Sequence, residues 1–265
     1  MYPSLKLFGC EIYLYHICAM TAFLAAIFVF QNRTKNVFRP EVQDDIIAMA
    51  GTDILFIIAG ASLHNKFLYA ASLRDFFHIL FVDTGIAFLG GLLGGLLGFL
   101  ILFPVFIGKR IKRIEVMNAF VPSVIIGHAI GRIGCLLGGC CYGKPSKWGI
   151  IYKAGTPAYQ MYGAEKLFPV PLAETVLLLI LLLIVLKIGK KPVSIYLLGY
   201  SVIRFCLEFI RGDDRGGTGF LSPAQKICTC ILIITIGVHL FNCLFKNKGY
   251  NLDSAISAAL GNRRN

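Results

Sequence analysis

Charged side chains are scarce in this sequence. Lys, Arg, Asp and Glu make up 15% of the 265 residues, whereas 57% of the residues are hydrophobic. An ordinary soluble domain carries roughly a quarter charged residues, and the mean hydropathy of +0.73 is far on the apolar side. The shortage of charge excludes a typical soluble domain and indicates a polytopic membrane protein.

Acidic residues are fewer than basic ones, 14 against 26, which gives a formal net charge of +12. Such an excess is typical of nucleic-acid-binding proteins. Here, however, the basic residues occur in short clusters between apolar runs, which is the pattern of loops that set membrane topology. We therefore expect the lipid bilayer as a partner and no nucleic acid.

Three further features are absent. The apolar run from Phe8 has no multi-basic region before it and is too long for a signal-peptide core, so we expect no cleavable signal peptide. No inverted repeat is visible, which argues against a small-solute transporter. No boundary of a second globular domain is visible either, so we expect one transmembrane domain over 1–250, with an outer loop at 143–168 and a short cytoplasmic tail at 251–265.

Long apolar runs are what the chain has in quantity. A helix needs about 20 apolar residues to cross the bilayer core, and seven runs qualify: 8–30, 44–63, 84–107, 116–138, 169–187, 193–210 and 224–245. The sequence thus predicts an all-α membrane protein with about seven transmembrane helices. The loops after odd-numbered runs hold 14 Lys and Arg residues against 9 on the other side, so we expect the N-terminus outside and the C-terminus in the cytoplasm.

The fourth run continues into a glycine-rich stretch, 127–149, and carries Arg132. An arginine at the centre of a membrane helix costs about 2.5 to 3.5 kcal/mol, so it should face a partner or a polar cavity. The glycines leave room for another backbone or a phosphate to approach the main chain. This combination indicates an anion site, with a structural ion pair as the alternative.

The sixth run carries a polar stripe. Tyr200, Arg204 and Glu208 stand at i, i+4 and i+8, so they share one helical face. Arg204 and Glu208 can neutralise each other as a purely structural pair. One carboxylate cannot also neutralise Arg132, and Glu174, at the start of the fifth run, is the candidate for the remaining counter-charge.

The nine cysteines are mostly scattered in apolar runs, and only Cys135, Cys140 and Cys141 form a group. We interpret the group as small side chains that fill space beside the glycines. A disulfide or redox pair is the second interpretation, since the site faces the oxidising side of the membrane. Metal binding is the least favoured, because three cysteines at this spacing lack an evident fourth ligand.

Two short motifs carry a resemblance to a known family. They are Gly131-Arg132-x-Gly134 with the glycine run to Gly143, and Tyr200-x3-Arg204-Phe205-x2-Glu208-Phe209-x-Arg211. In this order, and with the Gly90-Gly91 pair of the third run, they resemble the prolipoprotein diacylglyceryl transferase family over most of residues 8–245. The resemblance implies a seven-helix enzyme of the bacterial inner membrane. It would move a diacylglyceryl group from phosphatidylglycerol to the signal-peptide cysteine of a prolipoprotein and release glycerol phosphate.

The resemblance also implies roles for residues. Arg132 and Arg204 match the two arginines of the phosphate side, with Tyr200 and Glu208 as companions. The full set expected to bind substrate is Tyr200, Gly90, Gly91, Gly131, Gly134, Cys135, Gly139, Cys140, Gly143 and Glu174. The match fails near the acceptor: Leu89 replaces the family's histidine or tyrosine, and Cys135 and Cys140 replace an asparagine and a glutamate.

The reaction requires an in-line lipid, a stabilised phosphate and a deprotonated thiol. Arginine forks suit the first two requirements, and no metal or cofactor is needed for them. His128 lies four residues before Arg132, on the same helical face, and is our leading candidate for the general base, with Glu208 second. Two other functions stay open: a related transferase with a different acceptor, and a lipid-binding protein without catalysis.

Overall fold

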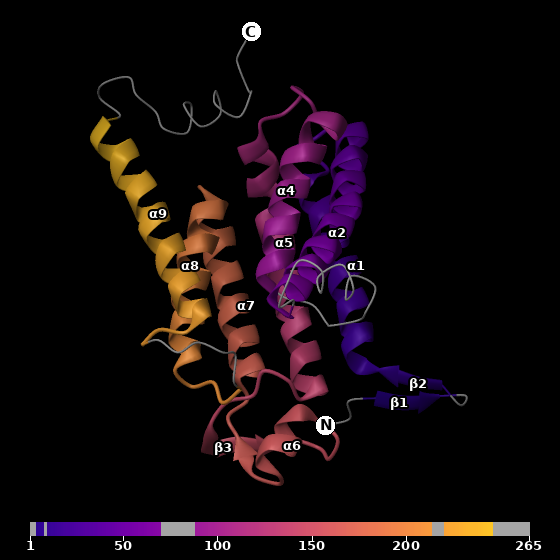
Figure 1. Ribbon diagram of the computed structural model, residues 1–265. Helices are drawn as coiled ribbons and strands as arrows, with labels where there is room; N and C mark the ends of the chain where they lie inside the picture. The colour runs from indigo at the N-terminus through magenta and orange to yellow at the C-terminus, as the bar shows by residue number, and fades with distance from the viewer. Residues whose placement is uncertain (1–3, 8–9, 70–87, 214–219, 246–265) are drawn as a thin grey trace. The chain divides into compact units, whose positions relative to one another are not determined.

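The computed structural model describes residues 4–7, 10–69, 88–213 and 220–245, and these are mostly helical (Figure 1). The tail at 251–265 and residues 84–87 of the third predicted run lie outside this part. The chain divides into two compact units, one made of 1–32 with 117–265 and the other of 33–116.

A long helix coincides with each of the seven apolar runs. These helices are α1 (Leu14–Thr34), α2 (Pro40–Tyr69), α4 (Phe88–Phe106), α5 (Arg113–Gly138), α7 (Val170–Ile188), α8 (Pro192–Glu208) and α9 (Pro223–Phe245). Five of them, α1, α2, α5, α7 and α9, are long and apolar enough to cross a membrane, whereas the apolar part of α4 begins only at Leu93 and α8 has 17 residues. The chain is therefore a multi-pass membrane protein, and the count of seven spans stays a prediction.

The protein is mostly helical, as predicted, but it is not all-α, because two small antiparallel sheets are also present. Strand β1 (Ser4–Leu7) pairs with β2 (Cys10–Tyr13), so the first membrane helix begins at Leu14 and not at residue 8. In the segment 143–168, β3 (Pro145–Ile151) pairs with β4 (Lys166–Leu167), and the short helix α6 (Pro157–Tyr162) lies between them in the chain. Hydropathy measures apolar length and does not register strand pairing, so neither sheet was predicted.

In the unit 33–116, glycines let α2 and α4 approach closely. A Cβ atom on Gly60 would collide with the Gly90 carbonyl oxygen, and one on Gly94 with the Phe56 carbonyl oxygen. Gly90 and Gly91 are buried. The four-residue glycine spacing of α4 therefore forms a helix-packing face, as predicted.

In the other unit, α5, α7 and α8 share an apolar core. Its buried members are Val121, Ile125, Ala129, Leu178, Leu181 and Val185. The side chain of Thr175 joins α7 to α5 by donating a hydrogen bond to the Ala129 carbonyl at 3.3 Å. Helix α1 packs on α5 at two glycines, Gly127 next to Ala22 and Gly134 next to Cys18, where there is little room for a side chain. This core fixes the polar faces of α5, α7 and α8 toward one another.

Candidate functional site

The candidate site is formed by side chains of three helices, α5, α7 and α8. Helix α5 carries His128 and Arg132 one turn apart, α7 carries Glu174 near its start, and α8 carries the polar stripe from Tyr200 to Glu208. All of these side chains are largely withdrawn from solvent, and the Glu174 side chain is 0% exposed.

Glu174 is the centre of the first polar cluster. Its Oε1 atom lies 3.1 Å from Arg132 Nε and accepts a hydrogen bond from the Tyr200 hydroxyl at 3.1 Å. Arg132 Nε also donates to His128 Nε2 at 3.3 Å. Glu174 Oε2 is buried and has no hydrogen-bond partner within the described residues. Glu174 thus holds the counter-charge position that the sequence suggested for it.

Stacked rings hold this cluster from the α8 side. The His128 ring meets the edge of the Tyr200 ring at a centroid distance of 4.8 Å, and Tyr196 stacks on Tyr200 at 5.8 Å. Tyr196 was not among the predicted site residues. Its position four residues before Tyr200 places it on the same polar stripe, and that spacing was the signal available in the sequence.

The second cluster lies at the end of α8. Arg204 Nη2 contacts Glu208 Oε2 at 2.7 Å, and Arg211 Nε lies 3.8 Å from the same oxygen. Arg211 also forms a two-pronged contact with Asp213, at 2.9 and 2.5 Å. One terminal nitrogen of Arg204 and one of Arg211 are buried without a hydrogen-bond partner among the described residues.

The backbone around Arg211 is held by residues 142–144. The Gly212 amide donates to the Tyr142 carbonyl at 3.0 Å, and the Lys144 amide donates to the Ile210 carbonyl at 2.9 Å. A Cβ atom on Gly143 would lie 2.6 Å from the Phe168 carbonyl oxygen, so this position needs glycine. Burial acts to lower the pKa of Arg211, but Asp213 and the Cys141 thiol outweigh it and raise that pKa above its usual value.

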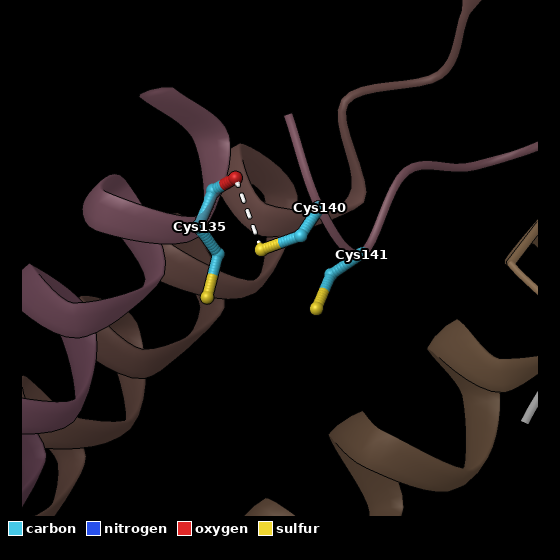
Figure 2. Close-up of side chains that lie close together, drawn as sticks. All are labelled: Cys135, Cys140 and Cys141. Carbon is cyan, nitrogen blue, oxygen red and sulfur yellow. Dashed lines mark hydrogen bonds between the residues drawn. The ribbon is translucent and has the colours of Figure 1, made fainter. Parts of the chain in front are cut away.

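A tight turn follows α5 and carries the cysteines. The Cys140 amide donates to the Cys135 carbonyl at 3.2 Å and the Gly139 amide to the Leu136 carbonyl at 3.3 Å, which is the Schellman pattern of helix ends. Gly139 takes the left-handed conformation that this motif requires, with φ of +67°. The turn folds Cys140 back over Cys135, and its sulfur donates to the Cys135 carbonyl at 3.6 Å (Figure 2).

The remaining predicted residues have different surroundings. Gly131 has open space where a Cβ atom would lie, and Gly134 packs on α1 near Cys18. Gly90 and Gly91 belong to α4 in the other compact unit, where they serve helix packing. Asp213 was not predicted as a site residue. It stands two residues after Arg211 and lies beyond the helical stripe of Tyr200, Arg204 and Glu208, so helical spacing gave no signal for it.

Fold and site together define a multi-pass membrane protein with buried arginine–carboxylate clusters on adjacent helices. The family model for prolipoprotein diacylglyceryl transferase matches residues 3–241, so the chain belongs to that family.

Several similar proteins bear the name phosphatidylglycerol–prolipoprotein diacylglyceryl transferase. The one from Clostridium tetani is 30% identical over 249 residues, which cover 89% of this chain and 95% of that protein. A second from Clostridium perfringens is 37% identical over 137 residues, covering 49% of this chain and 52% of the relative. One from Stenotrophomonas maltophilia is 28% identical over 250 residues, covering 80% and 81%.

Proposed function

We propose that this chain transfers a diacylglyceryl group from phosphatidylglycerol to the cysteine thiol of a prolipoprotein signal peptide and releases glycerol phosphate. Membership of the transferase family supports this reaction. The observation that carries it in this chain is a set of three largely buried guanidinium groups: Arg132 on α5, Arg204 on α8 and Arg211 just after α8. The transfer would take place at the bacterial inner membrane.

The lipid phosphate is proposed to bind between Arg132 and Arg204. Both arginines already have carboxylate partners, Glu174 for Arg132 and Glu208 for Arg204. A buried donor without a partner nevertheless costs about 1 to 3 kcal/mol, and Arg204 has one at Nη1. A phosphate oxygen can accept from this nitrogen with a short, charge-assisted bond, which makes lipid binding favourable without breaking the Arg204–Glu208 pair.

Arg211 extends the same anion site. Its buried terminal nitrogen also lacks a partner in the described part of the chain, and Glu208 lies between Arg204 and Arg211. Negative charge develops on the leaving phosphate oxygen as the bond to the glyceryl carbon breaks. Fixed guanidinium groups in a site that excludes water stabilise such charge most effectively.

His128 is the proposed general base, and Glu208 is the alternative. The Nε2 atom of His128 accepts a hydrogen bond from Arg132 Nε. This nitrogen is the one that would accept a proton, and in this structure the arginine occupies it. Binding of the phosphate by Arg132 would release this nitrogen for the acceptor thiol. Glu208 is the second choice because its carboxylate is already paired with Arg204 at 2.7 Å and lies 3.8 Å from Arg211.

The test is a reaction with purified protein in phosphatidylglycerol-containing vesicles and a synthetic signal peptide with one cysteine. We expect glycerol phosphate to be released and the peptide to gain the mass of one diacylglyceryl group. Serine in place of the peptide cysteine is the control and should give neither product. Glycerol phosphate release that does not depend on the peptide thiol would indicate a different acceptor, and no release at all would contradict an enzymatic function.

A further inference from the structure

The turn after α5 gathers three thiols. The sulfur atoms of Cys135, Cys140 and Cys141 all lie within 4.8 Å of one another, and all three residues are partly buried (Figure 2). Two features of the backbone produce this arrangement. The Schellman turn brings Cys140 over Cys135, and Cys141 follows with a left-handed φ of 60°.

The left-handed conformation of Cys141 is unusual for a residue with a Cβ atom. It costs roughly 1 to 2 kcal/mol for a side chain other than glycine, asparagine or aspartate. Such strain persists where surrounding structure enforces it, and it occurs preferentially at functional sites. Here the residue in this conformation is the one whose sulfur completes the group of three.

Two arginines interact with the thiols. Arg132 lies one helical turn before Cys135 and interacts electrostatically with Cys135 and Cys141. Arg211 also interacts with Cys141. Three thiolates would carry three negative charges, and a divalent cation leaves one of them uncompensated. Arg132 and Arg211, although each also has a carboxylate partner, lower the electrostatic cost of that remaining charge.

We propose that Cys135, Cys140 and Cys141 form a three-thiolate site for a zinc-class cation, whose fourth position binds the thiolate of the acceptor cysteine. This inference rests on the proposed function. Within the described residues, no further His, Cys, Asp or Glu joins the three sulfurs. A zinc site with three protein ligands and one open position is the arrangement of catalytic sites, whereas structural sites are closed by a fourth ligand.

Metal binding was the least favoured interpretation of the sequence because a fourth ligand was not evident. In a catalytic site the fourth position belongs to the substrate, so the protein does not need to supply that ligand. A thiol has a pKa of about 8.5 in water and reacts as its thiolate, so the acceptor must be deprotonated before it attacks. Coordination to a divalent ion removes the thiol proton outright. The metal site formed by Cys135, Cys140 and Cys141 would therefore supply the thiol activation that the reaction needs.

The chemical step balances without an oxidant or reductant. The acceptor thiol loses its proton to His128 or water and binds the cation as a thiolate. A sulfur electron pair then forms the S–C bond to the glyceryl carbon, and the C–O bond to phosphate breaks. Its electron pair leaves on the phosphate oxygen, next to Arg132, and the thioether product is a poor ligand that dissociates.

The test starts with metal content. We would purify the full-length protein without chelators and measure zinc by mass spectrometry, and we expect roughly one ion per chain. Addition of Cd²⁺ to metal-depleted protein should produce the ultraviolet absorption of cadmium thiolates. Single replacements Cys135→Ala, Cys140→Ala and Cys141→Ala should each weaken Cd²⁺ binding more than about 100-fold, since even second-shell changes cost 10- to 100-fold. Cys230→Ala, at an exposed position on α9, is the matched control and should bind normally.

Activity then separates this proposal from the proposed function. Chelation should abolish peptide modification and Zn²⁺ should restore it, while the Cys230→Ala variant behaves like the parent. Metal-free protein with full transferase activity, or alanine variants that all keep activity within about tenfold, would overturn the metal site and leave the transferase function intact. Zinc bound at the three cysteines in a protein without transferase activity would contradict the proposed function instead. A Cys135–Cys140 or Cys140–Cys141 disulfide in the active protein would also overturn the metal site.

Discussion

At the scale of single residues, Arg132 and Arg204 carry the proposed phosphate site. An arginine binds phosphate with a planar fork, whereas a lysine offers a compact point charge. We therefore expect Arg132→Lys to lose activity as severely as Arg132→Ala, by roughly 100- to 1000-fold. The measurement is glycerol phosphate release by purified variants whose folding has been verified.

The two arginines should also be coupled. Once either fork is missing the phosphate is misplaced, so the Arg132→Ala/Arg204→Ala double variant should lose little more than either single variant. An active Arg132→Lys variant, or losses that simply multiply, would be evidence against a shared phosphate.

Glu174 is the residue whose replacement should affect stability most. Its carboxylate is fully buried and pairs with Arg132, and breaking a buried pair by removing one partner costs about 3 to 5 kcal/mol. We expect Glu174→Gln, which preserves the shape of the side chain, to lower the free energy of unfolding by roughly that amount. Denaturant unfolding in detergent measures it, and Glu165→Gln, at an exposed site, should change stability by less than about 0.5 kcal/mol.

At the scale of elements, the end of α5 depends on Gly139. Its φ of +67° favours glycine, and a Cβ atom would lie 2.5 Å from Thr156 Cβ, at the N-terminus of α6. Gly139→Ala should therefore destabilise the protein by at least about 1 to 2 kcal/mol. Gly138→Ala is expected to have the opposite effect on stability. Gly138 is helical with open space at its Cβ position, so alanine there should raise the free energy of unfolding by about 0.5 to 1 kcal/mol. Thermal unfolding measures both variants, and equal melting temperatures would contradict a requirement for glycine at residue 139.

The contact between α2 and α4 gives a second element-scale prediction. A Cβ atom on Gly94 would collide with the backbone of Phe56, which cannot move aside as a side chain can. We expect Gly94→Ala to push the helices apart and lower the melting temperature. Gly51→Ala, on the same helix pair but with nothing near its Cβ position, should leave the melting temperature unchanged or raise it. A neutral Gly94→Ala variant would show that the two helices adjust at little cost.

At the scale of the whole molecule, the positive-inside rule predicts the orientation of the chain. A cysteine placed at exposed Lys147 should react with a membrane-impermeant thiol probe in intact cells, and one placed at exposed Lys112 only after lysis. Labelling of the parent chain sets the background from its native cysteines. The reverse pattern would invert the topology and place the proposed site on the cytoplasmic side.

The sequence alone determined the helices and the polar residues on them. A helix that crosses a bilayer needs a minimum length of apolar chain, and this length can be read directly from the sequence. The apolar runs therefore coincide with the long helices. A stripe such as Tyr200, Arg204 and Glu208 follows from helical periodicity in the same way. The motifs around Arg132 and Arg204 also indicated the family that the comparisons show.

Only the tertiary structure decided which of these residues meet. Pairing of Arg132 with Glu174, and of Glu174 with Tyr200, depends on how α5, α7 and α8 pack, and helical spacing does not fix that packing. The two small sheets join segments through backbone hydrogen bonds that hydropathy does not record. The cysteine spacing was visible from the start, but two left-handed residues, Gly139 and Cys141, determine that the three sulfurs lie within 4.8 Å. Backbone dihedral angles and helix packing are properties of the folded chain, and they turn a list of polar residues into a site.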